Sequence, residues 1–474
     1  MGYKPHPALE PRLIGYDPVV ELALDHLARF IDMVVDKYAE VPEKGVGPGQ
    51  PEYDPRPLLK LLLYGYAMGV FSWRRLEQNC KESLPYMLLV RDDRPSYHTI
   101  CTARVKYLEE LEWLWYCLFD FAVECGLTFV GRIAVDSGKF KADVSKESVV
   151  RKKLFAETRE KLKALLAQAD IADAADEEEG LAARSRTGIA AGSVKLRDIL
   201  RSFKKSDSAE PTVLSPKMAQ RVHQAIETLE MAEDAGLSHV SLTDPDARMM
   251  PVGAHKTIAM GHSLEVGTDS GLLVHSEVID ESSDTGRLPE AVESAIENDP
   301  AEVTLFVPDT HTACDLKRGN PVGTSAGKLG PQIPFTKVEG KDAYICPQGN
   351  ILKRNTSWMS GGRQIVTYRA TKSCEGCPLA SACLKQKKAK RRTIRVSEHQ
   401  ERLVDYLSGF NDPQFQSTYH QRGPCVETVF AMIRRILGFD RWHVRGAEKV
   451  ESEAMILTNA YQLRKLHKHW AASH

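Results

Sequence analysis

Three acidic residues stand beside apolar segments that could bring their carboxylates together. Asp136 and Asp309 each end a short apolar run expected to form a strand, and Glu427 lies early in an apolar helix expected over residues 426–437. Neighbouring strands can place two strand-end carboxylates at one edge of a sheet, and a helix packed on that sheet can add the third. Three oxygen ligands without a histidine favour Mg²⁺ or Mn²⁺ over Zn²⁺. Two such ions about 3.5–4 Å apart can clamp the attacking and leaving oxygens of a phosphoryl displacement.

These carboxylates alone do not decide the chemistry. The chain contains 64 acidic residues, and an Asp at the end of a strand is more often a turn residue or a helix cap. The three residues are also too far apart in the sequence to form a local motif.

A second candidate site is a cluster of cysteines. Cys374, Cys377 and Cys383 form the pattern Cys-x₂-Cys-x₅-Cys, and Cys346 is the best fourth ligand. A Cys-x₂-Cys turn lets two thiolates bind one tetrahedral Zn²⁺. A structural Zn²⁺ is therefore favoured over free thiols, and an iron–sulfur cluster is the third alternative. The other six cysteines lie in apolar or helical contexts and are expected in core packing: Cys80, Cys101, Cys117, Cys125, Cys314 and Cys425.

Composition limits the class of protein without naming a partner. The chain has 474 residues, enough for two to four domains. Its 63 basic and 64 acidic residues give a net charge of −1, which neither favours nor excludes a nucleic-acid partner. No apolar run reaches the ~18 residues of a membrane span, and the N-terminal residues have no apolar signal core. We therefore expect a cytoplasmic protein whose ten cysteines are thiols or metal ligands.

Residues 1–130 are expected to be helical. Pro55 and Pro57 mark the start of a long apolar helix, and Ser72 is expected to cap the next one. Several short helices with arginines on their polar faces suit a DNA-binding module, and they equally suit an ordinary helical bundle.

Beyond residue 130 the pattern alternates between strands and helices, which indicates an α/β fold. Strands are expected over residues 131–136, 263–268, 272–279 and 302–309, with a helix over 288–298. Residues 144–235 are highly charged and are interpreted as a helical insertion with helices over 151–167 and 217–235. The last part of the chain, residues 414–469, is helical again, with Gly438 and Gly446 as breaks.

Motifs spread along the chain resemble one family. The N-terminal part contains YDPRPLLKLLLYGY from Tyr53, GVFSWRRLE from Gly69 and RPSYHTI from Arg94. The segment around Asp136 is VDSGKFKAD, and TDPDARMM begins at Thr243. The C-terminal part holds VETVF around Glu427 and VRGAEKV from Val444. Through these motifs the chain resembles the DDE transposases of bacterial insertion sequences, specifically the insertion-sequence-1182 branch near the insertion-sequence-5 group.

The resemblance implies an RNase H-like catalytic core. Residues 1–130 would form a helical N-terminal DNA-binding domain, and residues 131–330 the first part of the core, interrupted by the insertion over 144–235. Residues 331–400 would form a Cys-rich, basic insertion, and residues 401–474 the C-terminal helical part of the core that carries Glu427. The family shares the cysteine arrangement, so a structural Zn²⁺ is expected there as well.

The resemblance also assigns the catalytic acids and their cofactor. It carries them onto Asp136, Asp309 and Glu427, which would hold two Mg²⁺ or Mn²⁺ ions, with Asp136 shared by both. Two departures from the family pattern stand out: Asp309 is followed by Thr310-His311-Thr312, and the lysine usual seven positions after the Glu is Arg434. Asp244 and Asp246, in a turn that contains Pro245, are alternatives for the second acid, although a structural or DNA-contacting role is favoured for them.

Basic residues in two regions are expected to contact DNA phosphates. Tyr419, Arg422 and Arg434 lie in the same helical region as Glu427, where they could grip the phosphates beside the scissile bond; a half-buried aromatic is an equal alternative for Tyr419. Six of the eight residues from Lys385 to Arg392 are basic. Such a run is usually a solvated surface, but beside a metal knuckle in a protein that resembles a DNA enzyme, a role in tracking phosphates is favoured. The residues assigned to that role are Lys387, Lys388, Lys390, Arg391 and Arg392.

The expected function is therefore that of a transposase. The protein would bind the terminal inverted repeats of its element as a homodimer on double-stranded DNA, hydrolyse a phosphodiester and join the 3′ end to target DNA, in the bacterial cytoplasm beside the nucleoid. The first alternative is a catalytically inactive or domesticated DNA-binding relative. A further alternative is a structural zinc protein whose cysteine knuckle serves assembly.

Overall fold

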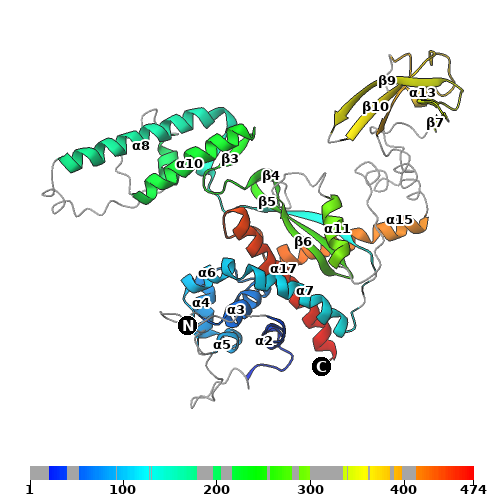
Figure 1. Cartoon of the computed structure of the whole chain (residues 1–474). Coiled ribbons are helices and arrows are strands. Elements are labelled where there is room, and N and C mark those ends of the chain that lie inside the picture. The colour runs from blue at the N-terminus through cyan, green and yellow to red at the C-terminus, as the bar shows by residue number, and fades with distance from the viewer. Residues whose placement is uncertain are drawn as a thin grey trace. The chain divides into compact units, whose positions relative to one another are not determined.

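The structure is a computed structural model that describes most of the chain. The described residues are 21–39, 53–91, 93–127, 129, 131–178, 196–203, 216–253, 257–279, 288–298, 335–338, 340–360, 363–384, 389–397 and 413–473. The chain divides into two compact units, Met1–Thr304 with Cys425–His474, and Leu305–Pro424. Figure 1 labels the elements of both units along the chain.

The first unit begins with helices whose starts follow from local sequence. In α3, Asp54 caps the first turn by accepting a hydrogen bond from the Arg56 backbone N–H, and Pro55 and Pro57 occupy positions that need no N–H donor. Ser96 caps α6, whereas Ser72 precedes α4 without a side-chain cap. The helices are α2 (Leu27–Tyr38), α3 (Pro55–Ala67), α4 (Trp73–Glu82), α5 (Leu84–Val90), α6 (Tyr97–Lys106) and α7 (Leu108–Glu124).

An antiparallel sheet follows the helices. Its strands are β1 (Ala134–Lys141), β4 (Arg248–Val252), β5 (Thr257–Asp269) and β6 (Leu272–Ile279), and β5 pairs with each of the other three. The prediction that the first strand ends at Asp136 is wrong. β1 continues to Lys141 and pairs with β5 along its whole length, so Asp136 lies inside a strand.

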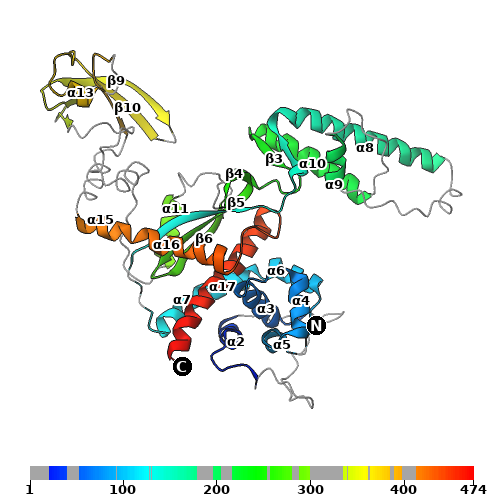
Figure 2. The same cartoon turned by 180° about the vertical axis from the view of Figure 1, so that it is seen from behind.

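Helices cover both faces of this sheet (Figures 1 and 2). Asp136 pairs with Val266 and Gly138 with Leu264, so these side chains share one face, called here the Asp136 face. That face is packed by α16 (Arg422–Ala431) and the π-helical turn η4 (Met432–Ile436). The opposite face, which carries Gly267, is covered by α11 (Leu288–Asn298) and is called the α11 face.

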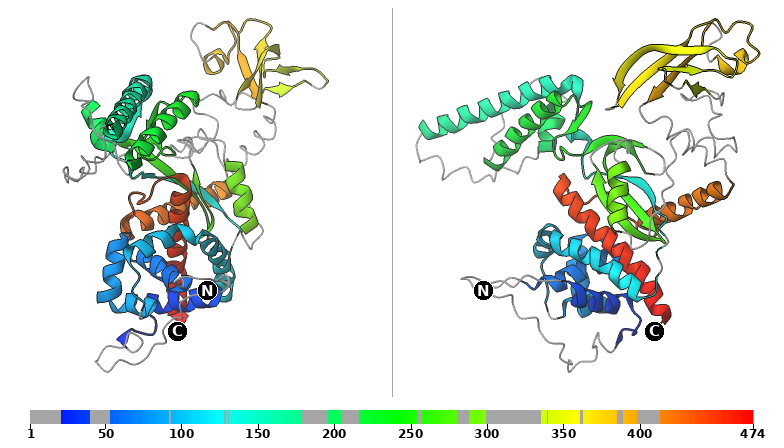
Figure 3. Two further views of the ribbon diagram at one scale, coloured as in Figure 1. Left: turned by 60° about the vertical axis from the view of Figure 1, so that its left-hand side comes forward. Right: turned by 45° about the vertical axis from the view of Figure 1, so that its right-hand side comes forward.

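The long helix α17 (Ala447–Ser473) joins the sheet to the N-terminal helices. It packs against β6 and against α3, α6 and α7 (Figure 3). One hydrophobic cluster consequently runs from Phe30 in α2 through Phe140 in β1 to Leu466 in α17. The expected boundary at residue 130 therefore falls within one continuous core.

The segment between β1 and β4 forms its own small core. A two-stranded sheet pairs β2 (Val149–Arg151) with β3 (His239–Ser241). The hydrophobic core beside this sheet includes Phe155, Leu162, Val222 and Leu229. The helical elements are η1 (Lys146–Ser148), η2 (Lys152–Leu154), α8 (Phe155–Glu178), α9 (Leu196–Phe203) and α10 (Pro216–Asp234), which agree with the predicted helical character of this segment.

The second unit contains a five-stranded antiparallel sheet. Its strand order is β11-β10-β9-β8-β7. The elements are β7 (Thr336–Lys337), β8 (Ala343–Ile345), β9 (Ile351–Ser360), β10 (Arg363–Ala370), α13 (Ala380–Cys383), β11 (Thr393–Ser397) and α15 (Pro413–His420). Across both units the mixture of helix and sheet agrees with the expected α/β class. No helix among the described residues is long and apolar enough to cross a membrane.

Candidate active site

Asp136 lies on a surface of β1 that is in direct contact with α16. A Cβ atom built on Gly138, two residues further along the strand, would lie 2.3 Å from Phe430 Cε1. Phe140, the next residue on this face, packs against the rings of Phe430, Phe439 and Trp442. Strand and helix can therefore approach this closely only because residue 138 is a glycine.

Glu427 lies at the same end of this contact as Asp136. Phe430 meets Gly138, and one turn later the Arg434 guanidinium lies over Phe140, so the contacts advance in the same direction along helix and strand. Glu427 is three residues before Phe430, and Asp136 is two residues before Gly138. Asp136 is half-buried and Glu427 is exposed.

Arg434 connects the two elements. Its Nη2 donates a hydrogen bond to the Lys139 carbonyl oxygen at 3.3 Å, and its Cζ lies 4.8 Å from the centre of the Phe140 ring and 5.6 Å from that of Phe430. Burial lowers the pKa of its guanidinium, and the negative charge of Asp136 opposes this shift. The π-helical turn that contains Arg434 widens the helix at this point, a distortion that is frequent at functional sites.

Several predicted site residues are described only in part or not at all. Asp309 lies outside the described residues, as do Lys387 and Lys388. Tyr419 lies in α15, and Arg422 is the first residue of α16.

Asp244 and Asp246 hold the beginning of α17. Asp244 Oδ1 accepts a hydrogen bond from the Gly446 backbone N–H at 3.2 Å, and Asp246 Oδ2 accepts one from Ala447 N–H at 2.9 Å. Nε2 of the buried His262 lies 3.1 Å from Oδ2, the other carboxylate oxygen of Asp244. Both acids therefore have a structural task, which accords with the structural role favoured for them over that of the second catalytic acid. The sequence signal for this task was the break at Gly446, which has φ 87° and directly precedes the first residue of α17.

Sequence reasoning missed a buried polar cluster around Glu453. This residue is fully buried in α17, and its carboxylate accepts hydrogen bonds from Tyr66 Oη at 2.5 Å, from Arg104 Nη1 at 3.4 Å and from the His443 backbone N–H at 2.7 Å. His443 Nδ1 is also 3.1 Å from Glu453 Oε1. The cluster ties α17 to α3 and α6. No signal in the sequence marks Glu453, because Glu448 and Glu451 lie just before it in the same helix.

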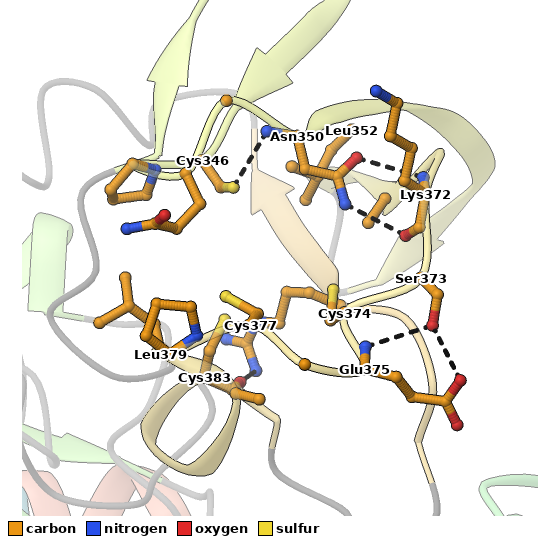
Figure 4. A pocket seen from close by; sticks show the side chains of 18 of the residues that line it. Cys346, Asn350, Leu352, Lys372, Ser373, Cys374, Glu375, Cys377, Leu379 and Cys383 are labelled. Carbon is orange, nitrogen blue, oxygen red and sulfur yellow. Dashed lines mark hydrogen bonds between the residues drawn. The ribbon is translucent and has the colours of Figure 1, made fainter.

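The four cysteines of the predicted zinc site line one pocket in the second unit, with a volume of about 280 Å³ (Figure 4). Cys346 Sγ accepts a hydrogen bond from the Asn350 backbone N–H at 3.3 Å, and Cys377 N–H donates to the Cys374 carbonyl oxygen, which forms the knuckle turn. Burial raises the pKa of the Cys383 thiol. Four sulfur donors around one space fit a structural Zn²⁺, although among the described residues no three of these sulfurs lie within 4.8 Å of one another.

The described part of the basic run divides into exposed and buried residues. Lys390 and Arg391 are exposed, and Lys390 Nζ lies 3.4 Å from Glu375 Oε1. Arg392 is buried: its Nη1 donates to the Cys383 carbonyl oxygen at 2.7 Å, and its guanidinium lies 5.9 Å from the Phe335 ring. The expectation that Arg392 tracks phosphates is therefore corrected, because this side chain supports the cysteine pocket from inside.

Two family models match parts of the chain. Residues 19–106 match a Transposase domain (DUF772), and residues 345–467 match a Transposase DDE domain. The second match includes Glu427 and the four cysteines, whereas Asp136 and Asp309 lie outside both. No curated protein and no solved structure matches the chain. The two matches support a DDE transposase.

Proposed function

We propose that this chain is a DDE transposase of a bacterial insertion sequence, which binds terminal inverted repeats and catalyses divalent-metal-dependent DNA cleavage and strand transfer. The observation that carries the proposal is the contact of α16 with the Asp136 face of β1, through Phe430 and Gly138. Asp136 and Glu427 are 291 positions apart in the chain. The contact supports a shared site because both residues belong to the same end of the interface between β1 and α16. The transposase matches over residues 19–106 and 345–467 support the same function.

The donor set suits hard divalent cations. Asp136, Asp309 and Glu427 would hold two Mg²⁺ or Mn²⁺ ions, which when bound activate the attacking oxygen and stabilise the leaving oxygen of a phosphodiester. Arg434 holds β1 and the helix together through Lys139 and Phe140, and it keeps a positive charge beside Asp136. In this proposal that charge also attracts the phosphate beside the scissile bond, together with Tyr419 and Arg422.

The remaining parts of the proposal concern architecture and binding. The sheet formed by β1, β5 and β6, with α11 and α16 on its two faces, would be part of an RNase H-like core. The helices before residue 130 and the exposed Lys390 and Arg391, with Lys387 and Lys388, would bind DNA. The cysteine pocket would hold a structural Zn²⁺, and the protein would act near the nucleoid as a homodimer on DNA.

The decisive experiment is metal-dependent cleavage of DNA that carries the element's own terminal repeats. Asp136→Asn and Glu427→Gln should each abolish cleavage in Mg²⁺ and in Mn²⁺ while leaving DNA binding nearly unchanged. Asp143→Asn is the matched control, because Asp143 lies just beyond β1 and is paired with Arg441 and Arg445 on the surface. Full cleavage by Asp136→Asn would remove this residue from the site.

The inactive-relative alternative rests on the unusual Thr310-His311-Thr312 after Asp309. It makes a different prediction in the same assay. If wild-type protein binds the repeats but cleaves them in neither metal, the chain is a DNA-binding relative without catalysis.

A further inference from the structure

A cluster of three potential metal ligands lies on the α11 face, away from Asp136. Glu265 of β5 is directly paired with Glu277 of β6, and His275 is paired with Gly267, so all three side chains project from this face. One ligand atom from each of Glu265, His275 and Glu277 lies within 4.8 Å of the other two. Among the described residues no other group of three or more such ligands comes this close. The neighbouring pair, Asp136 with Val266, points to the opposite face.

Two atoms of the cluster are buried without a hydrogen-bond partner. Glu265 is 2% exposed and His275 is 4% exposed. Glu265 Oε1 and His275 Nε2 face each other at 3.5 Å, and neither forms a hydrogen bond with any residue that the structure describes. A buried carboxylate oxygen and a buried ring nitrogen that form no hydrogen bond are costly, and a shared cation would satisfy both.

The histidine is already oriented as a metal ligand would be. Its Nδ1 lies 3.0 Å from Ser294 Oγ of α11, which fixes the ring and turns Nε2 towards Glu265. Metal-bound histidines almost always use their second nitrogen in such a hydrogen bond. Ser294 therefore takes the place that a supporting residue occupies around a metal centre.

We propose that Glu265, His275 and Glu277 bind one divalent transition-metal ion. Two carboxylates and one imidazole suit Zn²⁺ or Mn²⁺, whereas the imidazole disfavours Mg²⁺ and Ca²⁺. The ion ties β5 to β6, and through Ser294 it ties both strands to α11. The site is structural and independent of the catalytic centre, because its ligands project from the opposite face of the sheet. It does not depend on the proposed transposase activity.

The test requires a protein in which the other proposed metal sites are disabled. The background is the full chain with Cys374→Ser, Cys377→Ser and Asp136→Asn. Equilibrium dialysis against Zn²⁺ should show about one bound ion per chain in this background, as for a single site of this type. Adding Glu265→Gln with His275→Gln should lower that occupancy at least tenfold at the same free Zn²⁺ concentration. A background protein that binds no Zn²⁺ would overturn the proposal, as would unchanged binding after these two substitutions.

A matched control comes from the same strand. His262 of β5 is fully buried and pairs with one carboxylate, Asp244, and no third ligand from the described part of the chain joins them. His262→Gln in the same background should keep the bound Zn²⁺, and its loss there would mean that any disturbance of β5 removes the metal. The half-buried Glu277→Gln provides the milder variant, so if the double substitution unfolds, retention of full Zn²⁺ affinity by Glu277→Gln overturns the proposal.

A second measurement separates a metal site from an ordinary buried ion pair. Zn²⁺ should raise the melting temperature of the background protein, and the increase should disappear with EDTA and in the Glu277→Gln variant. An ion pair without metal predicts identical melting temperatures with Zn²⁺ and with EDTA, which would contradict the proposal.

Discussion

Gly138 and Phe430 are in contact so close that no side chain fits between them. A Cβ on Gly138 would lie within 3.0 Å of three atoms of the Phe430 ring. This pair sets the distance between β1 and α16, and therefore the distance between the elements that carry Asp136 and Glu427.

Gly138→Ala should push the helix away from the strand. Overpacking of this kind costs about 1–3 kcal/mol of unfolding free energy, and DNA cleavage should fall more than DNA binding because the two acids separate. Urea unfolding and a cleavage assay measure the two effects. Phe430→Leu in the same chain should restore part of both losses by making room. A double variant no better than Gly138→Ala would show that the contact does not set this spacing.

Asp246→Ala should destabilise the beginning of α17. The lost hydrogen bond to Ala447 N–H is a helix cap, and removal of such a cap costs about 0.5–2 kcal/mol. The unfolding free energy from urea titration reports the loss. Asp246→Asn keeps an oxygen acceptor and should cost less; equal losses from both variants would mean that the charge, and not the cap, provides the stability.

Glu453 should make the stability of the first unit depend on pH. Burial alone would raise its pKa, but hydrogen bonds from His443 and Tyr66 and the charge of Arg104 outweigh it, so the pKa lies below the ordinary value of 4.5. A lowered pKa in the folded state contributes stability that is complete above pH 4.5 and lost as the pH falls through the folded-state pKa.

The variant Glu453→Gln tests this dependence. It leaves Arg104 buried without its charged partner, which costs about 3–5 kcal/mol at neutral pH. The difference from wild type in unfolding free energy should narrow as the pH is lowered below 4.5. A difference that stays constant from neutral to acidic pH would show that the carboxylate charge is not what matters.

Cys377→Ser should remove one metal ion from the cysteine pocket. With Co²⁺ as the probe, the sulfur-to-metal absorption of the wild-type protein should disappear, and the melting temperature of the second unit should fall because a closed four-ligand site stabilises its fold. Cys101→Ser, outside the pocket, is the control and should keep the absorption. Absence of any sulfur-to-metal absorption in freshly reduced wild-type protein would rule out the site.

Lys390→Ala with Arg391→Ala should weaken binding to specific and random duplexes alike. Each lost phosphate contact should reduce the slope of log K against log salt by about 0.9, which a salt series measures. Both side chains are exposed, so the fold should survive. Arg392→Ala should instead lower the stability of the second unit, since it removes the hydrogen bond to Cys383. An unchanged affinity and slope in the double variant would leave the N-terminal helices as the main DNA-binding surface.

The sequence pattern predicted several elements of the first unit, misplaced the end of one strand, and missed the five strands of the second unit. The segments over 272–279 and 288–298 agree with β6 and α11. The predicted end of β1 at Asp136 was wrong because Ser137, Gly138 and Lys139 have the composition of a loop. They form a strand because Gly138 faces Phe430, a requirement set by a helix almost 300 residues away.

The candidate site was predictable only as far as residue types permit. Glu427 was recognisable as the one acid in the apolar stretch over 426–437, although the helix begins earlier, at Arg422. The cysteine spacing indicated one pocket, which Cys346 and Cys374 do share. The buried position of Arg392 was not recognisable, because consecutive basic residues give no pattern that shows which side chain is buried. Glu265 and His275 become neighbours only through the register of a hairpin with a shift in its pairing, which no local spacing reveals.

The two-stranded sheet of β2 and β3 acts as a clasp at the base of the charged insertion. Val149 pairs with Ser241 and Arg151 with His239, so the chain leaves and returns at adjacent points. The entropic cost of bringing the two ends of such a segment together rises only slowly with its length. The register of β1 against β5 therefore does not depend on the residues between β2 and β3. That segment can be lengthened, shortened or replaced without changing how β1 and β5 pair.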